Sequence, residues 1–145
     1  MTRRRLPPEV AAAYDAFPGV AREKLMELRD LVFEAAAETP GVGPIREALR
    51  WGEPAFLTGP GIGSSIRLAW KPRTPDQAGA YFICNTNLVE RFRTMFGEDL
   101  TFEGDRAILL PIDGDLPARQ LKRCFAEALT YHLAKQRRRP SAVAG

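Results

Sequence analysis

Residues 20–38 carry the clearest helical pattern in the chain, and this pattern most limits how the rest can fold. Apolar residues recur at helical spacing along one face of this segment: Leu25, Leu28, Val32 and Ala35. Charged residues, among them Arg22 and Arg29, alternate in sign on the side that we expect to face water. Met26 and Phe33 lie beside the apolar stripe and widen it. A face of this width predicts a helix that packs against a sheet, not a coiled-coil seam.

Short segments with strand character follow this helix, separated by connections of hairpin length. They lie at 55–58, 65–71, 80–84, 100–103 and 106–112. Residues 45–49 fit either a further strand or one helical turn, because periodicity alone does not decide between them. The order of elements predicts an α+β fold, an antiparallel β-sheet with helices packed on one face. A parallel doubly wound sheet would need more crossover helices.

Three further helices are expected to pack on this sheet. A short helix spans 9–17, so the chain begins with two helices, 9–17 and 20–38. The mid-chain helix begins at Asn87, which has Glu90 three residues later as in a capping box, and ends at Gly97. The C-terminal helix begins at Pro117 and carries one continuous apolar face as far as His132. Near the end of that helix, a histidine most often has a structural role.

The positive charge of the chain is concentrated at its two ends. The 145 residues carry a net charge of +3, but seven cations lie in 1–5 and 135–139, and without them the body has a net charge of −4. One domain over 9–134, with basic flexible tails at 1–8 and 135–145, is therefore expected. Such tails attract polyanions weakly and without specificity, although neither contains an aromatic residue that could stack on a base.

Most catalytic and metal-binding arrangements find no support in the sequence. A single histidine argues against a serine triad and against common zinc sites. Cys84 and Cys124 are too few for a disulfide scaffold and too far apart for a zinc knuckle. The glycines of 59–63 precede a strand rather than a helix, so a hairpin loop is expected there and not a phosphate-binding loop. We predict no catalytic residue, no metal ligand and no cofactor, and we expect a cytoplasmic protein without a membrane segment.

The segment 51–56, Trp-Gly-Glu-Pro-Ala-Phe, is the best candidate for a functional site. A Gly-Glu-Pro break between two aromatic residues predicts a rigid corner with the Trp51 ring against the sheet and the Glu53 carboxylate beside it. Either this corner is a wall of a ligand pocket, with Lys71 or Arg106 as the partner of Glu53, or it is only a packed corner. The candidate ligand-binding residues are Trp51, Glu53, Phe56, Lys71 and Tyr81.

The same segment resembles a sequence motif of the YdhG-like family, bacterial domains of unknown function. Five other segments in the expected order extend the resemblance over about 9–134: YDAFP (14–18), LMELR (25–29), IRLAWKP (66–72), FEGDRA (102–107) and ALTYH (128–132). The resemblance implies an α+β fold related to frataxin, and some members are described as intracellular iron chaperones. It assigns no metal ligands. The mixed charges of 20–38 differ from the acidic ridge of frataxin-like iron binding.

The sequence is compatible with two main functions. The first is a non-catalytic binding module whose 51–56 corner contacts a small molecule or protein that the sequence does not identify. The alternative is a nucleic-acid-associated protein that acts through its basic tails. An enzyme ranks third, because the sequence assembles no catalytic group of residues.

Overall fold

A computed structural model describes residues 5–138, which form five helices and six strands. The helices are α1 (Pro8–Asp15), α2 (Gly19–Glu38), α3 (Leu88–Phe96), α4 (Ala118–Leu129) and α5 (Tyr131–Arg138). The strands are β1 (Arg46–Arg50), β2 (Glu53–Leu57), β3 (Ile66–Trp70), β4 (Gln77–Phe82), β5 (Thr101–Glu103) and β6 (Ala107–Pro111). The prediction of an α+β fold is confirmed.

All six strands join one antiparallel sheet in the order β1-β2-β3-β4-β6-β5. The ambiguous residues 45–49 belong to strand β1, which pairs along its whole length with β2 from Arg46–Leu57 to Arg50–Glu53. The loop at 59–63 connects β2 to β3, as the hairpin prediction required. Each pair of neighbouring strands except β4 and β6 is consecutive in the chain, because the connections are too short for crossovers.

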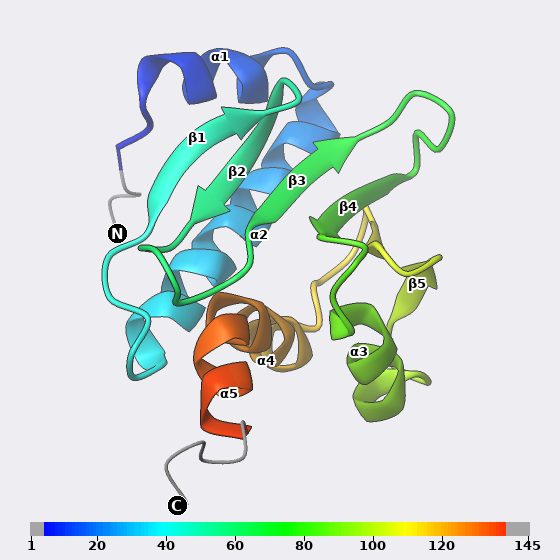
Figure 1. The fold of residues 1–145 in the computed structure, drawn as a ribbon. Helices are drawn as coiled ribbons and strands as arrows, with labels where there is room; N and C mark the ends of the chain where they lie inside the picture. Colours follow the sequence, from blue (N-terminus) through cyan, green and yellow to red (C-terminus); the bar gives the residue numbers. More distant parts are fainter. Residues whose placement is uncertain (1–4, 139–145) are drawn as a thin grey trace, which may run out of the picture.

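The hydrophobic core lies between one face of the sheet and the helices. Helix α2 lies behind β1, β2 and β3, and the side of these strands that faces the viewer carries no helix (Figure 1). Phe56 on β2 meets Phe33 of α2 edge to face, with ring centroids 5.8 Å apart. Phe82 on β4 meets Phe92 of α3 in the same manner at 5.0 Å. The wide apolar face of 20–38 therefore covers the sheet, as predicted.

Arg29 is the main departure from the expected pattern of α2. The prediction that it faces water is wrong, because its side chain is 0% exposed. Its Nε and Nη2 atoms donate to the two carboxylate oxygens of Glu47 at 2.7 and 2.8 Å, and its guanidinium lies 5.0 Å from the Phe33 ring centroid. Burial of the cation is tolerated because β1 presents this carboxylate on the core side of the sheet. The bond to Glu47 also keeps the pKa of Arg29 above its ordinary value, although desolvation opposes this.

The C-terminal helix is not continuous, so the predicted single helix is wrong. It breaks at Thr130, whose hydroxyl donates to the Ala126 carbonyl at 2.7 Å. The Ile62 carbonyl of the β2–β3 loop then accepts from the backbone N–H groups of His132 and Leu133 at 3.0 and 3.1 Å. These bonds satisfy donors that a new helix start leaves unpaired. His132 consequently lies exposed in the first turn of α5, not on a buried face near a helix end.

The mid-chain helix α3 has the predicted ends, Asn87 and Gly97, but neither predicted capping interaction forms. Asn87 has φ −95° and ψ 17°, outside the extended region that an N-cap residue normally adopts, and its side chain makes no capping bond. The Thr86 hydroxyl instead accepts from the Leu88 N–H at 3.4 Å. Gly97 follows α3 with φ −59°, so it is right-handed and does not supply a left-handed cap.

Parts of both predicted tails have packed or regular structure. Leu6 packs against the core, and Pro8 begins α1. Residues 135–138 continue helix α5, where the Gln136 side chain donates to the Gly61 carbonyl at 3.4 Å. The prediction of flexible tails is wrong for these positions, because neighbouring elements offer them partners. The remainder, 1–4 and 139–145, lies outside the described residues.

The two cysteines differ in access to solvent. Cys84 is exposed, whereas Cys124 is buried on α4, where desolvation raises the pKa of its thiol to about 12. At about pH 8, we expect a thiol-reactive chromogenic disulfide to modify Cys84 in the native protein and Cys124 only after unfolding. Cys84→Ser should then abolish the native reaction, and rapid native labelling of that variant would contradict the burial of Cys124.

Candidate functional site

Trp51 lies at the tip of the β1–β2 hairpin. The loop between the paired residues Arg50 and Glu53 contains only Trp51 and Gly52, and both have positive φ, 56° and 76°. A two-residue type I′ turn requires such values. The indole side chain is not covered by the sheet, since the residue is 89% exposed. The prediction that its ring lies against the sheet is wrong, because a hairpin tip has no facing strand.

The turn conformation itself predicts the effect of a substitution. Asn favours the left-handed region and the first position of a type I′ turn, whereas a bulky residue there is strained. We expect Trp51→Asn to raise the free energy of unfolding by about 1 kcal/mol in urea denaturation followed by circular dichroism. Trp51→Val should lower it, since a β-branched residue is the least suited to positive φ. A large destabilisation by Trp51→Asn would show that the indole supports the fold.

Phe56 does not share a surface with Glu53. Successive residues of a strand point to opposite faces, so positions 53 and 56 of β2 lie on different sides of the sheet. Phe56 is fully buried against the helices. It therefore belongs to the core, and the 51–56 segment does not form a pocket wall made of Trp51, Glu53 and Phe56 together.

Glu53 is held between two cations. Its Oε1 accepts from Arg67 Nη1 of β3 at 2.5 Å, and its Oε2 accepts from Lys71 Nζ at 2.8 Å. The Glu53 side chain is 16% exposed, so this group of three charges is partly shielded from water. Lys71 was one of the two cations expected here. The other partner is Arg67 rather than Arg106, because Arg67 lies beside Ala55 in the β2–β3 ladder.

Tyr81 lies beneath the same two cations. The Arg67 Cζ and Lys71 Nζ atoms are 5.7 and 5.4 Å from its ring centroid, distances typical of cation–π contacts. The ring also lies over Gly79, where a Cβ atom would come within 2.6 Å of Tyr81 Cε1. Burial raises the pKa of the Tyr81 hydroxyl despite the nearby Lys71, so the phenol is neutral at physiological pH. The structure thus brings Glu53, Lys71 and Tyr81 together.

These residues belong to the side of the sheet without helices, which we call the open face. The strand pairs define its members: Arg46, Ala48, Arg50, Glu53, Ala55, Leu57, Arg67, Ala69, Lys71, Gln77, Gly79, Tyr81, Thr101, Glu103, Ala107, Leu109 and Pro111. Arg73 in the β3–β4 loop joins this face, since its Nη2 lies 3.7 Å from Glu103 Oε1. Five cations thus share the open face with two carboxylates.

A hollow of about 560 Å³ adjoins strand β1 at the edge of the open face. It is lined by Pro44, Arg46, Arg50, Leu57, Thr58, Gly59 and Pro60. Arg46 and Arg50 are exposed and have no acidic partner within residues 5–138. An unneutralised pair of guanidinium groups beside a hollow is suited to an anion.

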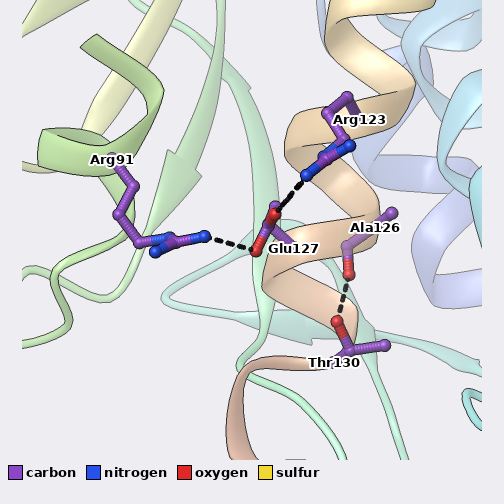
Figure 2. Close-up of polar contacts among 5 residues, drawn as sticks. All are labelled: Arg91, Arg123, Ala126, Glu127 and Thr130. Atoms are coloured by element: carbon purple, nitrogen blue, oxygen red, sulfur yellow. Dashed lines mark hydrogen bonds and ion pairs between the residues drawn. The ribbon is translucent and has the colours of Figure 1, made fainter. Parts of the chain in front are cut away.

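A second charged cluster joins helices α3 and α4. Figure 2 shows Glu127 of α4 between Arg91 of α3, at 3.3 Å, and Arg123 of its own helix, at 3.1 Å. The Glu127 side chain is 16% exposed. A hollow of about 340 Å³ beside Arg91 is lined only by residues of α3 and its start. Because Glu127 pairs with Arg91 across the gap between α3 and α4, this cluster fastens the two helices together.

The described part of the chain carries neither a cluster of metal ligands nor a membrane-spanning helix. Residues 5–138 contain no group of three or more His, Cys, Asp or Glu side chains placed to hold one metal ion. None of the helices in that range is long and apolar enough to cross a membrane. Comparisons with protein families, with curated proteins and with solved structures found no match to this chain.

Sequence reasoning missed four of the five cations on the open face, Arg46, Arg50, Arg67 and Arg73. Alternation along 65–71 places Arg67 and Lys71 on one side of a strand, which is a usable signal. The strand register that brings Arg67 to Glu53 leaves no comparable mark in the sequence. Arg46 and Arg50 required residues 45–49 to be recognised as a strand.

Removal of the Glu53 charge should have a measurable but moderate effect. We expect Glu53→Gln to lower the free energy of unfolding by about 1 kcal/mol, because Arg67 and Lys71 lose their shared carboxylate, and partial exposure of Lys71 limits the loss. The loss should shrink when salt is added. Glu90→Gln, at an exposed position of α3, is the control and should stay within about 0.5 kcal/mol of the wild type in urea unfolding. Equal stability of both variants would contradict a stabilising role for Glu53.

Proposed function

We propose that this chain is a non-catalytic binding module that binds an anionic partner on the open face of its sheet. The observation that carries the proposal is the charge of this face, where five cations lie with two carboxylates although the body of the chain has a net negative charge. Cations gathered on one face raise the local concentration of anions and direct their approach.

The chemistry of the site supports binding rather than catalysis. Glu53 is already bound by Arg67 and Lys71, so its carboxylate is poorly placed to accept a proton from a substrate. The Tyr81 phenol is neutral and lies beneath the cations. Arg46 and Arg50, by contrast, are exposed beside a hollow and suited to binding a carboxylate or a phosphate.

The resemblance to YdhG-like proteins bears on the proposal in two respects. It suggests an intracellular module, and we propose a cytoplasmic location because both cysteines are free thiols and one of them is exposed. It also suggests iron as cargo. Hard cations prefer clusters of carboxylate oxygens, and no such cluster lies within 5–138, so we propose an anionic partner and not iron.

Binding through the basic ends is the second candidate function. Lys135 and Arg137 are exposed on α5, and they continue the run of cations that reaches Arg139 in the sequence. A polyanion would bind such an end by releasing counterions, without sequence preference. Binding through the ends and binding through the open face would use different cations. Removing the positive charges of one site at a time therefore distinguishes the two functions.

The test uses the full chain and two matched variants that each lose three positive charges. The open-face variant combines Arg46→Gln, Arg50→Gln and Arg73→Gln. The tail variant combines Lys135→Gln, Arg137→Gln and Arg139→Gln. Calorimetric titration with polyphosphate and with polyglutamate should show weaker binding for the open-face variant, by about tenfold or more at low salt, and little change for the tail variant. The reverse order would contradict the proposal and favour binding through the tails.

A further inference from the structure

The exposed Trp51 is a feature that folding does not explain. Its indole contributes nothing to the core, and its backbone adopts a left-handed conformation that large side chains rarely take. Gly, Asn or Asp would suit this turn better. Strained residues that persist in a fold often lie at ligand-binding sites, which directs attention to what the indole could contact.

The surroundings of Trp51 are cationic. Arg50 precedes it and pairs across the hairpin with Glu53, which in turn binds Arg67 and Lys71. Arg46 lies four residues before Arg50 on β1, about 13 Å from it at the usual rise of a strand. One aromatic ring thus stands at the end of a row of guanidinium groups that borders the hollow beside β1.

Small residues occupy the centre of the open face. Its central positions are occupied by Ala48, Ala55, Ala69, Gly79 and Ala107, with the Tyr81 ring over Gly79. An extended peptide gains specificity from pockets that receive alternate side chains, and a floor of this kind offers few. These positions are themselves covered, with Ala55, Ala69 and Ala107 at most 1% exposed, so the face presents its exposed arginines and the Trp51 ring to a partner. Such a surface suits a chain that has charge along its backbone and flat rings that can stack on the indole.

From these observations, we infer that the open face binds single-stranded nucleic acid, with Trp51 stacking on a base and with Arg46 and Arg50 contacting phosphates. The inference rests on the proposed function and names the class of its anionic partner. A single strand fits because its bases are free to stack on an aromatic side chain, whereas those of a duplex are already stacked on one another. Phosphates follow one another closely along a strand, so a row of arginines can contact several at once.

The experiment is a fluorescence anisotropy titration of the full chain with short labelled oligonucleotides. The probes are single-stranded DNA, RNA of the same sequence, and the corresponding DNA duplex. We expect one or both single strands to bind more tightly than the duplex. Trp51→Asn should weaken binding of the single strand by about tenfold, whereas Trp51→Phe, which keeps an aromatic ring, should stay within about threefold of the wild type. Thermal unfolding of Trp51→Asn should show that its fold is intact.

Salt dependence tests the arginines separately. Between about 50 and 200 mM salt, Arg46→Gln should reduce the slope of log affinity against log salt by about 0.7, the value for one phosphate contact on a single strand. Arg119→Gln is the matched control, because Arg119 is exposed on α4, away from the open face, and should leave the slope unchanged. An unchanged affinity of Trp51→Asn, tighter binding of the duplex, or equal slopes for the two arginine variants would overturn the inference.

Failure of this inference differs from failure of the proposed function. If single strands do not bind but the binding of polyglutamate still depends on Arg46, Arg50 and Arg73, the partner is an acidic protein segment. Only the nucleic acid inference then fails. If the binding of no polyanion depends on these arginines, both the nucleic acid inference and the proposed function fail.

Discussion

Glu47→Ala should lower the free energy of unfolding by about 3–5 kcal/mol, the largest loss that we expect from a polar substitution in this chain. The substitution would leave the Arg29 guanidinium buried without the carboxylate that now accepts two of its hydrogen bonds. The side chains of Arg29 and Glu47 are 0% and 5% exposed, so water cannot replace the lost partner without opening the core. Urea unfolding would show the loss as a lower midpoint at an unchanged slope.

Two controls isolate the burial of this pair. Glu38→Ala removes the carboxylate that pairs with Lys122 on the surface, and it should cost less than about 1 kcal/mol. The double substitution Arg29→Met with Glu47→Leu should recover much of the stability lost in Glu47→Ala, because it removes both charges and fills their space. A loss from Glu47→Ala as small as that from Glu38→Ala would contradict the buried ion pair.

Phe56→Ala should cost about 3–5 kcal/mol, the range for a large aromatic residue removed from a packed core. Phe56 is fully buried and its ring meets Phe33 edge to face, so truncation leaves a cavity between β2 and α2. Phe56→Leu should cost much less, since it keeps most of the buried apolar volume. Urea unfolding of the two variants measures the difference. Near-wild-type stability of Phe56→Ala would show that this part of the core refills or is loosely packed.

The elements of the fold could be predicted because local signals identify them. Turn residues separate the six strands, and the wide stripe of 20–38 shows that a helix covers a sheet. The burial of Arg29 could not be predicted in this way, since its partner Glu47 lies 18 residues away on a strand that the sequence left ambiguous. A charged residue on a helix resembles a solvated one until its partner is placed.

The candidate site was predicted in part for a similar reason. Glu53, Lys71 and Tyr81 lie together, whereas Phe56 lies on the other face of the sheet. Residues three apart in a strand have their side chains on opposite faces. Strand alternation alone could have shown this. The exposure of Trp51 contradicts the general tendency of large aromatic residues to be buried, and only the two-residue length of the turn explains it.

The contact between the β2–β3 loop and the last two helices has a consequence for how the chain is made. The Ile62 carbonyl and the Ser64 N–H find their partners in α5 and at the Ala128 carbonyl, and Gln136 reaches Gly61 from 75 residues further along the chain. Gly63 is held so close to the Leu129 carbonyl that no Cβ atom would fit between them. While α4 and α5 are still inside the ribosome, the loop has none of these partners and α2 lacks the helix that packs along it. The native fold can therefore be completed only after α4 and α5 have left the ribosome, and until then the emerging chain exposes its apolar core.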